Sequence, residues 1–292
     1  MTRTQYERRW ATGSAALSVL ALTHPTGVLV FGASACLLCL VAQKTRLDLG
    51  LAFLLTLALM FAQAASGVMN DLFDVDLDRA AKPWRGLPAG LVTVRQARAL
   101  AAAFIGLAIF TSALVSPASC AILCAGITVS GLYSGWLKRT CLSWVPYVVA
   151  YPSLPVWVWI SLGAFRVSLV NIYWAGLALV LGVHLVNQLR DYEEDEWQGV
   201  RGFVQCLGKP KAILGCFALL AIAPVPLLLT RKGEPNPAFA AALWGAAFLH
   251  WLLIVPGILK SGWKPEATEF RRIFRALQVS APLLTAAWLL AV

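Results

Sequence analysis

Charged side chains are scarce in this chain. Only 13% of its 292 residues are Asp, Glu, Lys or Arg, whereas a soluble globular protein carries about 25%. Hydrophobic residues make up 59% of the chain, and its mean hydropathy is +0.73. So little charge excludes an ordinary soluble globular domain and indicates a chain that lies in a lipid bilayer.

Nothing in the chain indicates nucleotide binding or a cysteine-based metal or redox site. The chain has no glycine loop of the GxxxxGK[ST] or GxGxxG type, so nothing indicates nucleotide binding. Its seven cysteines include a CxxC pair, Cys36 and Cys39, and a pair one helical turn apart, Cys120 and Cys124. Both pairs lie in apolar segments without a nearby histidine. We interpret them as small hydrophobic side chains rather than a metal or redox site.

Long apolar segments make up most of the chain. A helix needs about 20 predominantly apolar residues to cross a bilayer, and nine segments meet this requirement. They cover residues 13–42, 49–69, 96–115, 117–136, 142–163, 168–189, 211–230, 237–259 and 273–291. Their continuous apolar character predicts helices rather than barrel strands. The sequence therefore predicts one all-α polytopic membrane domain over residues 1–292, with a break or tilt near His24-Pro25 and a tight hairpin at Ser116-Pro117.

The basic residues are distributed unevenly between the loops. Most of the 24 Lys and Arg lie in the N-terminal tail and in the loops after the second, fourth, sixth and eighth segments. Loops rich in Lys and Arg stay on the cytoplasmic side of a membrane. The pattern predicts a cytoplasmic N-terminus and accounts for the net charge of +10 through membrane topology. We therefore expect membrane lipid, and not nucleic acid, as a partner.

Carboxylates gather in two short windows, although an unpaired charge near hydrocarbon is costly. The first window reads NDLFDVDLD and the second reads NQLRDYEED. In both, an asparagine is followed at four-residue intervals by two aspartates, which gives Asn70, Asp74 and Asp78 in the first and Asn187, Asp191 and Asp195 in the second. This spacing predicts a polar stripe on one helix face at the cytoplasmic end of an even-numbered segment. The repeat suggests two related halves.

Stacked carboxylates repel one another unless a cation lies between them. Hard oxygen ligands suit Mg²⁺ or Ca²⁺, and the absence of thiol or imidazole from the cluster argues against zinc. Basic side chains are expected on the same side of the membrane: Lys82, Arg85, Lys138, Arg139, Arg190 and Arg201. Acidic and basic groups together predict a metal-bound diphosphate. The other acidic side chains of the two windows are interpreted as solvated: Asp76, Glu193, Glu194 and Glu196.

Over essentially its whole length the chain resembles the UbiA superfamily of intramembrane prenyltransferases. Residues 70–78 match the first motif of that family, NDxxDxxxD, and residues 191–195 match its second, DxxxD. The segment KPWRGLPAG resembles the family's KPxRPLPxG, with Gly86 in place of the usual proline. The segment YSGWLKR resembles a tyrosine–lysine motif ahead of the fifth helix. One departure is His24-Pro25, where many relatives carry Arg-Pro.

The resemblance implies nine transmembrane helices around a central cavity, two Mg²⁺ ions and cytoplasmic loops that cap the site. The implied metal ligands are Asp71, Asp74 and Asp78 for one ion and Asp191 and Asp195 for the other. The implied substrate-binding residues are Asn70, Lys82, Arg85, Lys138, Asn187, Arg201 and Tyr151. The implied catalytic residues are Asp74, Asp191, Asp195, Lys138 and Tyr133. Aromatic faces can stabilise a carbocation, which makes Tyr147, Tyr151, Trp157 and Trp159 candidates for lining the cavity.

The expected function is Mg²⁺-dependent transfer of an isoprenyl group from a prenyl diphosphate to a lipophilic acceptor, with an aromatic acceptor expected. A terpene cyclase of the same superfamily stays open as an alternative, because the same motifs would ionise the same diphosphate. A transporter with alternating access is a third hypothesis. Its site would lie near the membrane midplane, whereas both motifs are predicted at one end of their segments.

Overall fold

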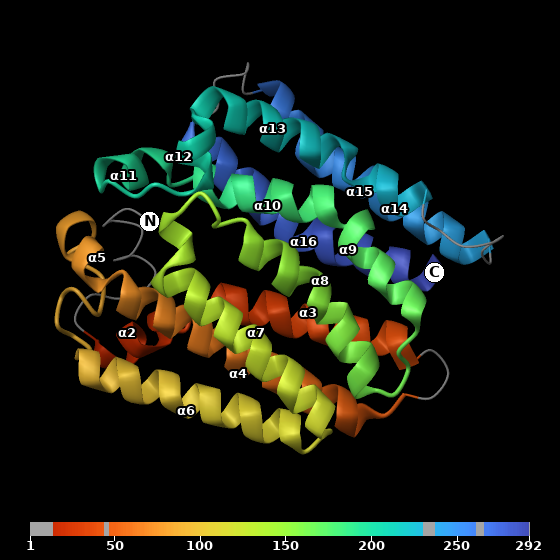
Figure 1. The fold of residues 1–292 in the computed structure, drawn as a ribbon, viewed down its shortest axis with the longest axis horizontal. Coiled ribbons are helices and arrows are strands. Elements are labelled where there is room, and N and C mark those ends of the chain that lie inside the picture. Colours follow the sequence, from red (N-terminus) through yellow and green to blue (C-terminus); the bar gives the residue numbers. More distant parts are fainter. Residues whose placement is uncertain (1–13, 44–46, 230–236, 261–265, 292) are drawn as a thin grey trace. The chain divides into compact units, whose positions relative to one another are not determined.

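The structure is a computed structural model that describes residues 14–43, 47–229, 237–260 and 266–291. Figure 1 shows these residues as helices joined by loops, and the described ranges contain no strand. The predicted all-α class is therefore confirmed. The chain divides into two compact units, residues 1–136 with 160–162 and residues 137–159 with 163–292. The N-terminal tail, with its predicted cytoplasmic position, lies largely outside the described residues.

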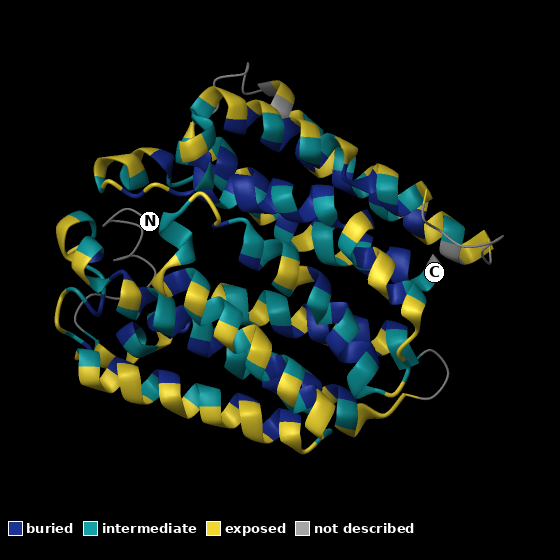
Figure 2. Cartoon of the chain, viewed as in Figure 1, coloured by how far each residue is buried: buried dark blue, intermediate teal, exposed yellow. Residues whose placement is uncertain are grey.

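Helix α4 is the centre of the first unit and packs against α3, α6 and α7. The helices of this unit are α2 (Ala15–Leu22), α3 (Pro25–Gln43), α4 (Leu49–Phe73), α5 (Val75–Ala81), α6 (Val94–Ala113) and α7 (Pro117–Gly135). Figure 2 shows an exposed stripe along α6. Large apolar side chains such as Leu107, Ile109 and Phe110 are exposed on α6. An apolar exposed face suits a helix that borders lipid.

The first apolar segment breaks where the sequence predicts. Helix α2 ends at Leu22 and α3 begins at Pro25, and His24 between them has a φ of 52°. Gly67 of α4 permits this break, because a Cβ atom there would lie 3.0 Å from the backbone of Leu22 and Thr23. The break brings the His24 side chain to the C-terminal end of α4, where the first acidic window lies.

Helices α6 and α7 form the predicted tight hairpin. Ser116 caps α7 by accepting a hydrogen bond from the Ser119 amide at 3.0 Å, and Pro117 occupies the first helical position, where no amide hydrogen is needed. The hydroxyls of Ser112 and Ser119 lie 2.8 Å apart and join the two helices. Local capping chemistry therefore accounts for the turn.

Helix α10 is the centre of the second unit and packs against α13 and α16. The elements of this unit are η1 (Leu137–Arg139), α8 (Val145–Ser161, most of it), η2 (Val167–Asn171), α9 (Ile172–Ala175), α10 (Leu177–Leu189), α11 (Tyr192–Trp197), α12 (Phe203–Leu207), α13 (Lys209–Ile222), α14 (Pro224–Leu229), α15 (Pro237–Lys260) and α16 (Ala267–Ala291). The chain bends by 45° between the η2–α9 segment and α10.

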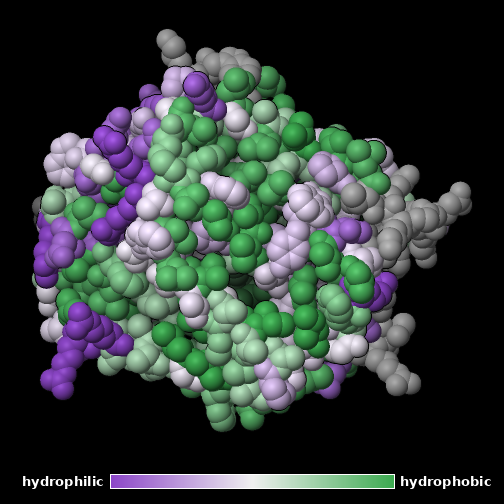
Figure 3. Space-filling view, viewed as in Figure 1, coloured by the Kyte–Doolittle hydropathy of each residue, from purple (hydrophilic) through white to green (hydrophobic). Residues whose placement is uncertain are grey.

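Within the described residues, six helices are long and apolar enough to cross a membrane, and a seventh span appears if the bent pair counts as one. Hydrophobic side chains cover much of the face in Figure 3. The protein is therefore an integral, multi-pass membrane protein. Two predicted spans are shorter here, since α8 has 17 residues and the apolar part of α15 covers Ala240–Pro256. The count of nine, and the single domain over the whole chain, stay predictions.

Candidate active site

The first acidic window crosses a break between two helices. Helix α4 ends at Phe73 and α5 begins at Val75. Asp74 between them has φ −93° and ψ 0°, in the sparsely populated bridge region where many active-site residues lie. Hydrogen bonds from the Asp74 amide to Asn70 (3.0 Å) and from the Asp78 amide to Asp74 (2.8 Å) keep the four-residue register through the break.

The second acidic window has the same local structure. Helix α10 ends at Leu189, and Asp191 follows with φ −116° and ψ 13° at the start of α11. The Asp195 amide donates to the Asp191 carbonyl at 2.9 Å. Each window thus combines a long apolar helix, an aspartate at the break and a last aspartate on a short helix. This likeness supports the repeat seen in the sequence.

The prediction that each set of residues forms a stripe on a single helix is wrong, because both sets cross a break. The physical reason is the charge in the windows. Asp76 and Asp78 lie in the first turn of α5, and Glu193, Glu194 and Asp195 lie in the first turn of α11. Negative side chains stabilise the start of a helix through its dipole, so each window favours a new helix start over continuation of the old helix.

Three carboxylates of the first window are buried. The exposed fractions of Asp71, Asp74 and Asp78 are 4%, 9% and 5%. Arg85 compensates two of them: its Nη2 donates to both Asp71 oxygens at 2.9 Å, and its Nη1 donates to Asp78 Oδ2 at 2.5 Å. Burial alone would lower the pKa of Arg85, but Asp71 and Asp78 raise it above its usual value. The guanidinium is therefore charged at any physiological pH.

Two further side chains, His24 and Lys82, border this cluster. His24 Nε2 lies 3.0 Å from Asp71 Oδ1, and Lys82 Nζ lies 3.9 Å from Asp78 Oδ1. The structure therefore brings the predicted residues Asp71, Asp78, Lys82 and Arg85 together. His24 was noticed in the sequence only as a departure from the usual Arg-Pro, so its contact with Asp71 is new. Asp76 is exposed and pairs with Arg79 at 2.6 Å, as expected for a solvated side chain.

An arginine also neutralises the second window. Arg190 Nε donates to Asp191 Oδ2 at 2.9 Å, and its guanidinium lies 4.6 Å from the centre of the Phe274 ring. Glu193 and Glu196 are exposed, as expected for solvated side chains. A hydrogen bond from Lys209 lowers the pKa of Glu193. Asp191 therefore has an arginine partner in the second unit, as Asp71 and Asp78 have in the first.

Aromatic side chains lie beside the end of α10. The Tyr147 and Tyr151 rings stack with centroids 5.2 Å apart, and the Tyr147 ring centre is 4.5 Å from that of His184. The Asn187 amide donates to the Tyr147 hydroxyl at 2.8 Å. Trp157 and Trp159, the other cavity candidates, are each 2% exposed.

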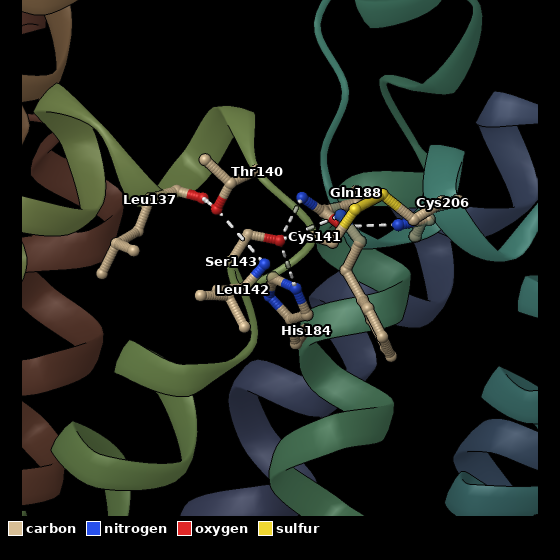
Figure 4. Close-up of a disulfide and its surroundings, with 10 residues drawn as sticks. Leu137, Thr140, Cys141, Leu142, Ser143, His184, Gln188 and Cys206 are labelled. Carbon is tan, nitrogen blue, oxygen red and sulfur yellow. Dashed lines mark hydrogen bonds between the residues drawn. A yellow bond between two sulfur atoms is a disulfide. The ribbon is translucent and has the colours of Figure 1, made fainter.

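A buried serine joins the loop before α8 to α10 and α12 (Figure 4). Ser143 Oγ accepts hydrogen bonds from Gln188 Nε2 at 3.0 Å and from the Phe203 amide at 3.1 Å. It lies 3.2 Å from His184 Nε2, to which its own hydrogen is left to donate. Gln188 Oε1 in turn accepts from the Val204 amide at 3.1 Å. This network fixes the segment that follows the second acidic window.

A disulfide between Cys141 and Cys206 lies beside this network, with the two Cα atoms 5.8 Å apart (Figure 4). This pairing could not be predicted from the sequence, since neither cysteine belongs to a recognisable spacing. Cys36, Cys39, Cys120 and Cys124, which the sequence did single out, are free thiols.

The other predicted site residues have the following positions. Tyr133 lies on α7 in the first unit and Lys138 on η1 in the second, both half-buried. Asn70 is half-buried near the end of α4, and Arg201 is exposed shortly after Gly199, whose φ of 70° makes the turn that ends the second window.

The chain belongs to the UbiA prenyltransferase family, which matches residues 10–264. It is thus an intramembrane prenyltransferase by family. Among similar proteins, the digeranylgeranylglyceryl phosphate synthase of Methanopyrus kandleri is 26% identical over 256 residues, which cover 82% of this chain and 89% of the relative. The synthase of the same name from Saccharolobus solfataricus is 28% identical over 202 residues, covering 65% of this chain and 70% of the relative.

Solved structures share the fold. A UbiA homologue from Archaeoglobus fulgidus bound to GPP and Mg²⁺ superposes with a TM-score of 0.68 at 19% identity, covering 92% of this chain and 99% of the other. A digeranylgeranylglyceryl phosphate synthase structure gives a TM-score of 0.67 at 19% identity, covering 95% and 98%. At this identity the likeness shows the fold.

The donors of the first window fit a divalent cation in chemical type. Carboxylate oxygens are the ligands that Mg²⁺ prefers, and Asp71 and Asp78 already converge on one positive group, the Arg85 guanidinium. Within the described part of the chain, however, no three His, Cys, Asp or Glu side chains lie close enough to hold a metal. In this conformation the arginine takes the position between the carboxylates.

Proposed function

We propose that this protein transfers an isoprenyl group from a prenyl diphosphate to a lipophilic acceptor, by ionising the allylic C–O bond. The observation that carries the proposal is the cluster of buried aspartates Asp71, Asp74 and Asp78 beside Arg85, at the end of an apolar helix in an NDxxDxxxD motif. Buried carboxylates are costly unless they bind a cation, and this cost favours a binding role over a structural one.

Two Mg²⁺ ions are proposed, one held by Asp71, Asp74 and Asp78 and the other by Asp191 and Asp195. When bound, the ions act as Lewis acids that stabilise the negative charge of the departing diphosphate. The aspartates that follow α4 and α10 would hold these ions. Both motifs end even-numbered spans, so they emerge on the same side of the bilayer.

The basic and polar residues of the proposed site bind the diphosphate directly. Lys82, Arg85, Lys138 and Arg201 supply positive charge that is fixed before the bond breaks, which favours the charged transition state. Asn70 donates to a diphosphate oxygen. Tyr133 is proposed as a catalytic side chain beside the leaving group.

The aromatic residues at the start of α8 protect the reactive carbon. Tyr151, stacked on Tyr147, presents a ring face that stabilises an allylic cation, and the apolar surroundings exclude the water that would capture it. Asn187 fixes the Tyr147 ring through its hydroxyl, which gives Asn187 a part in shaping the substrate site.

Nine membrane spans are proposed, with α8 and α15 as the two shorter ones and η2–α9–α10 as one bent span. The positive-inside rule places the N-terminus and the acidic windows on the cytoplasmic side. The acceptor is proposed to be lipophilic. An aromatic compound is the class expected from the sequence, and the name of the archaeal relatives points to a glyceryl phosphate lipid.

The decisive experiment supplies geranylgeranyl diphosphate and Mg²⁺ to the purified protein in lipid, first without an acceptor. Diphosphate release and extractable hydrocarbons are measured, with EDTA as the control. We expect little turnover until a geranylgeranylglyceryl phosphate or an aromatic acceptor is added, after which a prenylated product appears. Abundant EDTA-sensitive cyclic hydrocarbon without an acceptor would instead identify a terpene cyclase, and no EDTA-sensitive diphosphate release under any condition would refute both.

A further inference from the structure

Each acidic window holds an arginine where the proposed function needs a metal ion. In the first unit, Arg85 occupies both oxygens of Asp71 and one oxygen of Asp78. In the second unit, Arg190 occupies Oδ2 of Asp191. In both halves of the chain an arginine therefore binds aspartates that the proposed function assigns to metals, by a bridge in the first unit and by a single bond in the second.

The arginine and a divalent cation compete for the same lone pairs. Arg85 is itself only 23% exposed, and the two carboxylates that it bridges are 5% and 8% exposed as side chains. Asp71 Oδ1 also contacts His24. A cation with short bonds to Asp71 and Asp78 would have to enter where the guanidinium lies. Arg85 must therefore move when the cation binds.

We propose that Arg85 and Arg190 are exchangeable counter-ions. They neutralise the aspartates in the metal-free protein, and they are released when a divalent cation and a diphosphate bind together. This inference rests on the proposed function, and it adds that the metal and the diphosphate depend on each other for binding. A guanidinium displaced into a buried position without an anion is strongly destabilising. The metal alone therefore binds weakly, and the diphosphate that arrives with the metal accepts the displaced guanidinium.

Arg190 also contacts an aromatic ring, which can hold its guanidinium after release from Asp191. Its guanidinium already lies 4.6 Å from the centre of the Phe274 ring, and a cation–π contact of this kind is favourable. Arg190 is also 31% exposed. Its release therefore costs less than that of Arg85, and the exchange at Arg85 governs how strongly the metal and the diphosphate depend on each other.

The test measures Mn²⁺ binding to the purified full chain by electron paramagnetic resonance at pH 8, without any diphosphate. Arg85→Gln removes the competing cation, so Mn²⁺ should bind about tenfold more tightly than to the unmodified protein, the change that about 1.4 kcal/mol produces. The same variant should bind inorganic diphosphate more weakly in saturating Mg²⁺. Opposite signs for the two ligands are the signature of the exchange.

Arg79→Gln is the matched control. Arg79 is exposed and pairs with the exposed Asp76 on the same short segment, so its loss removes one positive charge nearby without touching Asp71 or Asp78. Mn²⁺ affinity should then change by less than about twofold, because exposed charges are screened. An equal gain in Arg79→Gln and Arg85→Gln would reduce the effect to long-range electrostatics and overturn the proposal, as would unchanged or weaker Mn²⁺ binding in Arg85→Gln.

Thermal unfolding gives a second readout. Without Arg85 the buried carboxylates lack their main counter-ion, so Arg85→Gln should be stabilised by Mg²⁺ far more than the unmodified protein is. If Arg85→Gln does not fold even in Mg²⁺, Arg85→Lys serves instead, since it keeps the charge and loses the two-pronged bond. It should show a smaller change of the same sign, and no change in Mn²⁺ affinity would overturn the proposal. Prenyl diphosphate turnover of the unmodified protein, measured separately, tells a failure of the exchange from a failure of the proposed function.

Discussion

The side-chain amide of Asn187 donates a hydrogen bond to the hydroxyl of Tyr147, 2.8 Å away on the neighbouring helix α8. Asn187 corresponds in the repeat to Asn70 of the first window. One member of the repeated pair is thus committed to positioning an aromatic ring that stacks on Tyr151. The two acidic windows have the same local backbone conformation, but the side chains around Asn70 and Asn187 differ.

Replacing either partner of this hydrogen bond should cost stability. Asn187→Ala and Tyr147→Phe are each expected to lower the free energy of unfolding by about 1 kcal/mol, and the double variant by less than the sum. Thermal or denaturant unfolding in detergent measures this coupling. Tyr173→Phe is the control, because Tyr173 bonds Ser153 instead. Its effect should add to that of Asn187→Ala, and full additivity of the Asn187 and Tyr147 changes would show that the bond contributes nothing.

The aspartates at the two helix breaks should be indispensable for turnover. Asp74→Asn and Asp191→Asn are each expected to reduce Mg²⁺-dependent diphosphate release by at least about 100-fold, since each removes a charged ligand at the reacting group. Folding should survive, because asparagine keeps the shape of the side chain and an oxygen that can accept a hydrogen bond. Asp76→Asn, which changes an exposed position of the first window, should keep nearly full activity. Near-normal activity in either break variant would contradict the two-metal assignment.

The Cys141–Cys206 disulfide should stabilise the second unit. The bond closes a loop with a sequence separation of 65, and restricting the unfolded chain to that extent corresponds to about 4 kcal/mol. Cys141→Ser is therefore expected to lower the midpoint of thermal unfolding, and dithiothreitol should lower the midpoint of the unmodified protein equally.

The control for this measurement is Cys120→Ser, which changes a free thiol of α7 and should leave the response to dithiothreitol intact. Both bonded cysteines are exposed, so the reductant has access to them. Mass spectrometry after alkylation counts the protected thiols. Alkylation of Cys141 and Cys206 without prior reduction would show that the bond is not formed.

A methyl group at Gly86 should disturb the loop that carries Arg85. A Cβ atom there would lie 2.6 Å from Ser18 Cβ of α2, so Gly86→Ala is expected to lower the free energy of unfolding by about 1 to 3 kcal/mol through overpacking. Adding Ser18→Gly should restore most of this loss. Gly106→Ala, where a Cβ meets open space on α6, is the control and should be neutral or mildly stabilising. The measurement is the unfolding of these three variants and of the unmodified protein in detergent, and a failure of Ser18→Gly to rescue would exclude this clash as the cause.

The sequence predicted the features that depend on local chemistry. The break at His24-Pro25 and the hairpin at Ser116-Pro117 follow from proline and capping residues next to each other in the chain. The acidic windows were found because their spacing repeats. Contacts between distant segments gave no such signal: His24 with Asp71, Ser143 with Gln188, and Cys141 with Cys206 each join residues that only tertiary packing brings together.

The helix breaks within the windows were missed for a different reason. Four-residue spacing is the period of a continuous helix, and the backbone hydrogen bonds at Asp74 and Asp78 do keep that register. The clustered negative charge opposes continuation and favours a new helix start. Spacing alone carries no information about this competition. In the sequence Arg190 is likewise one of several basic residues, and its pairing with Asp191 depends on side-chain geometry that spacing does not determine.

The close approach of Gly86 to Ser18 links two positions that no motif connects. A proline at position 86, the usual residue of the KPxRPLPxG segment, would carry its Cβ into Ser18. We therefore expect relatives with that proline to have glycine at the position of Ser18 or a displaced short helix. The two positions should covary across the family. The residue at position 86 of the loop motif would then indicate where α2 packs, in a region where the sequence has no motif of its own.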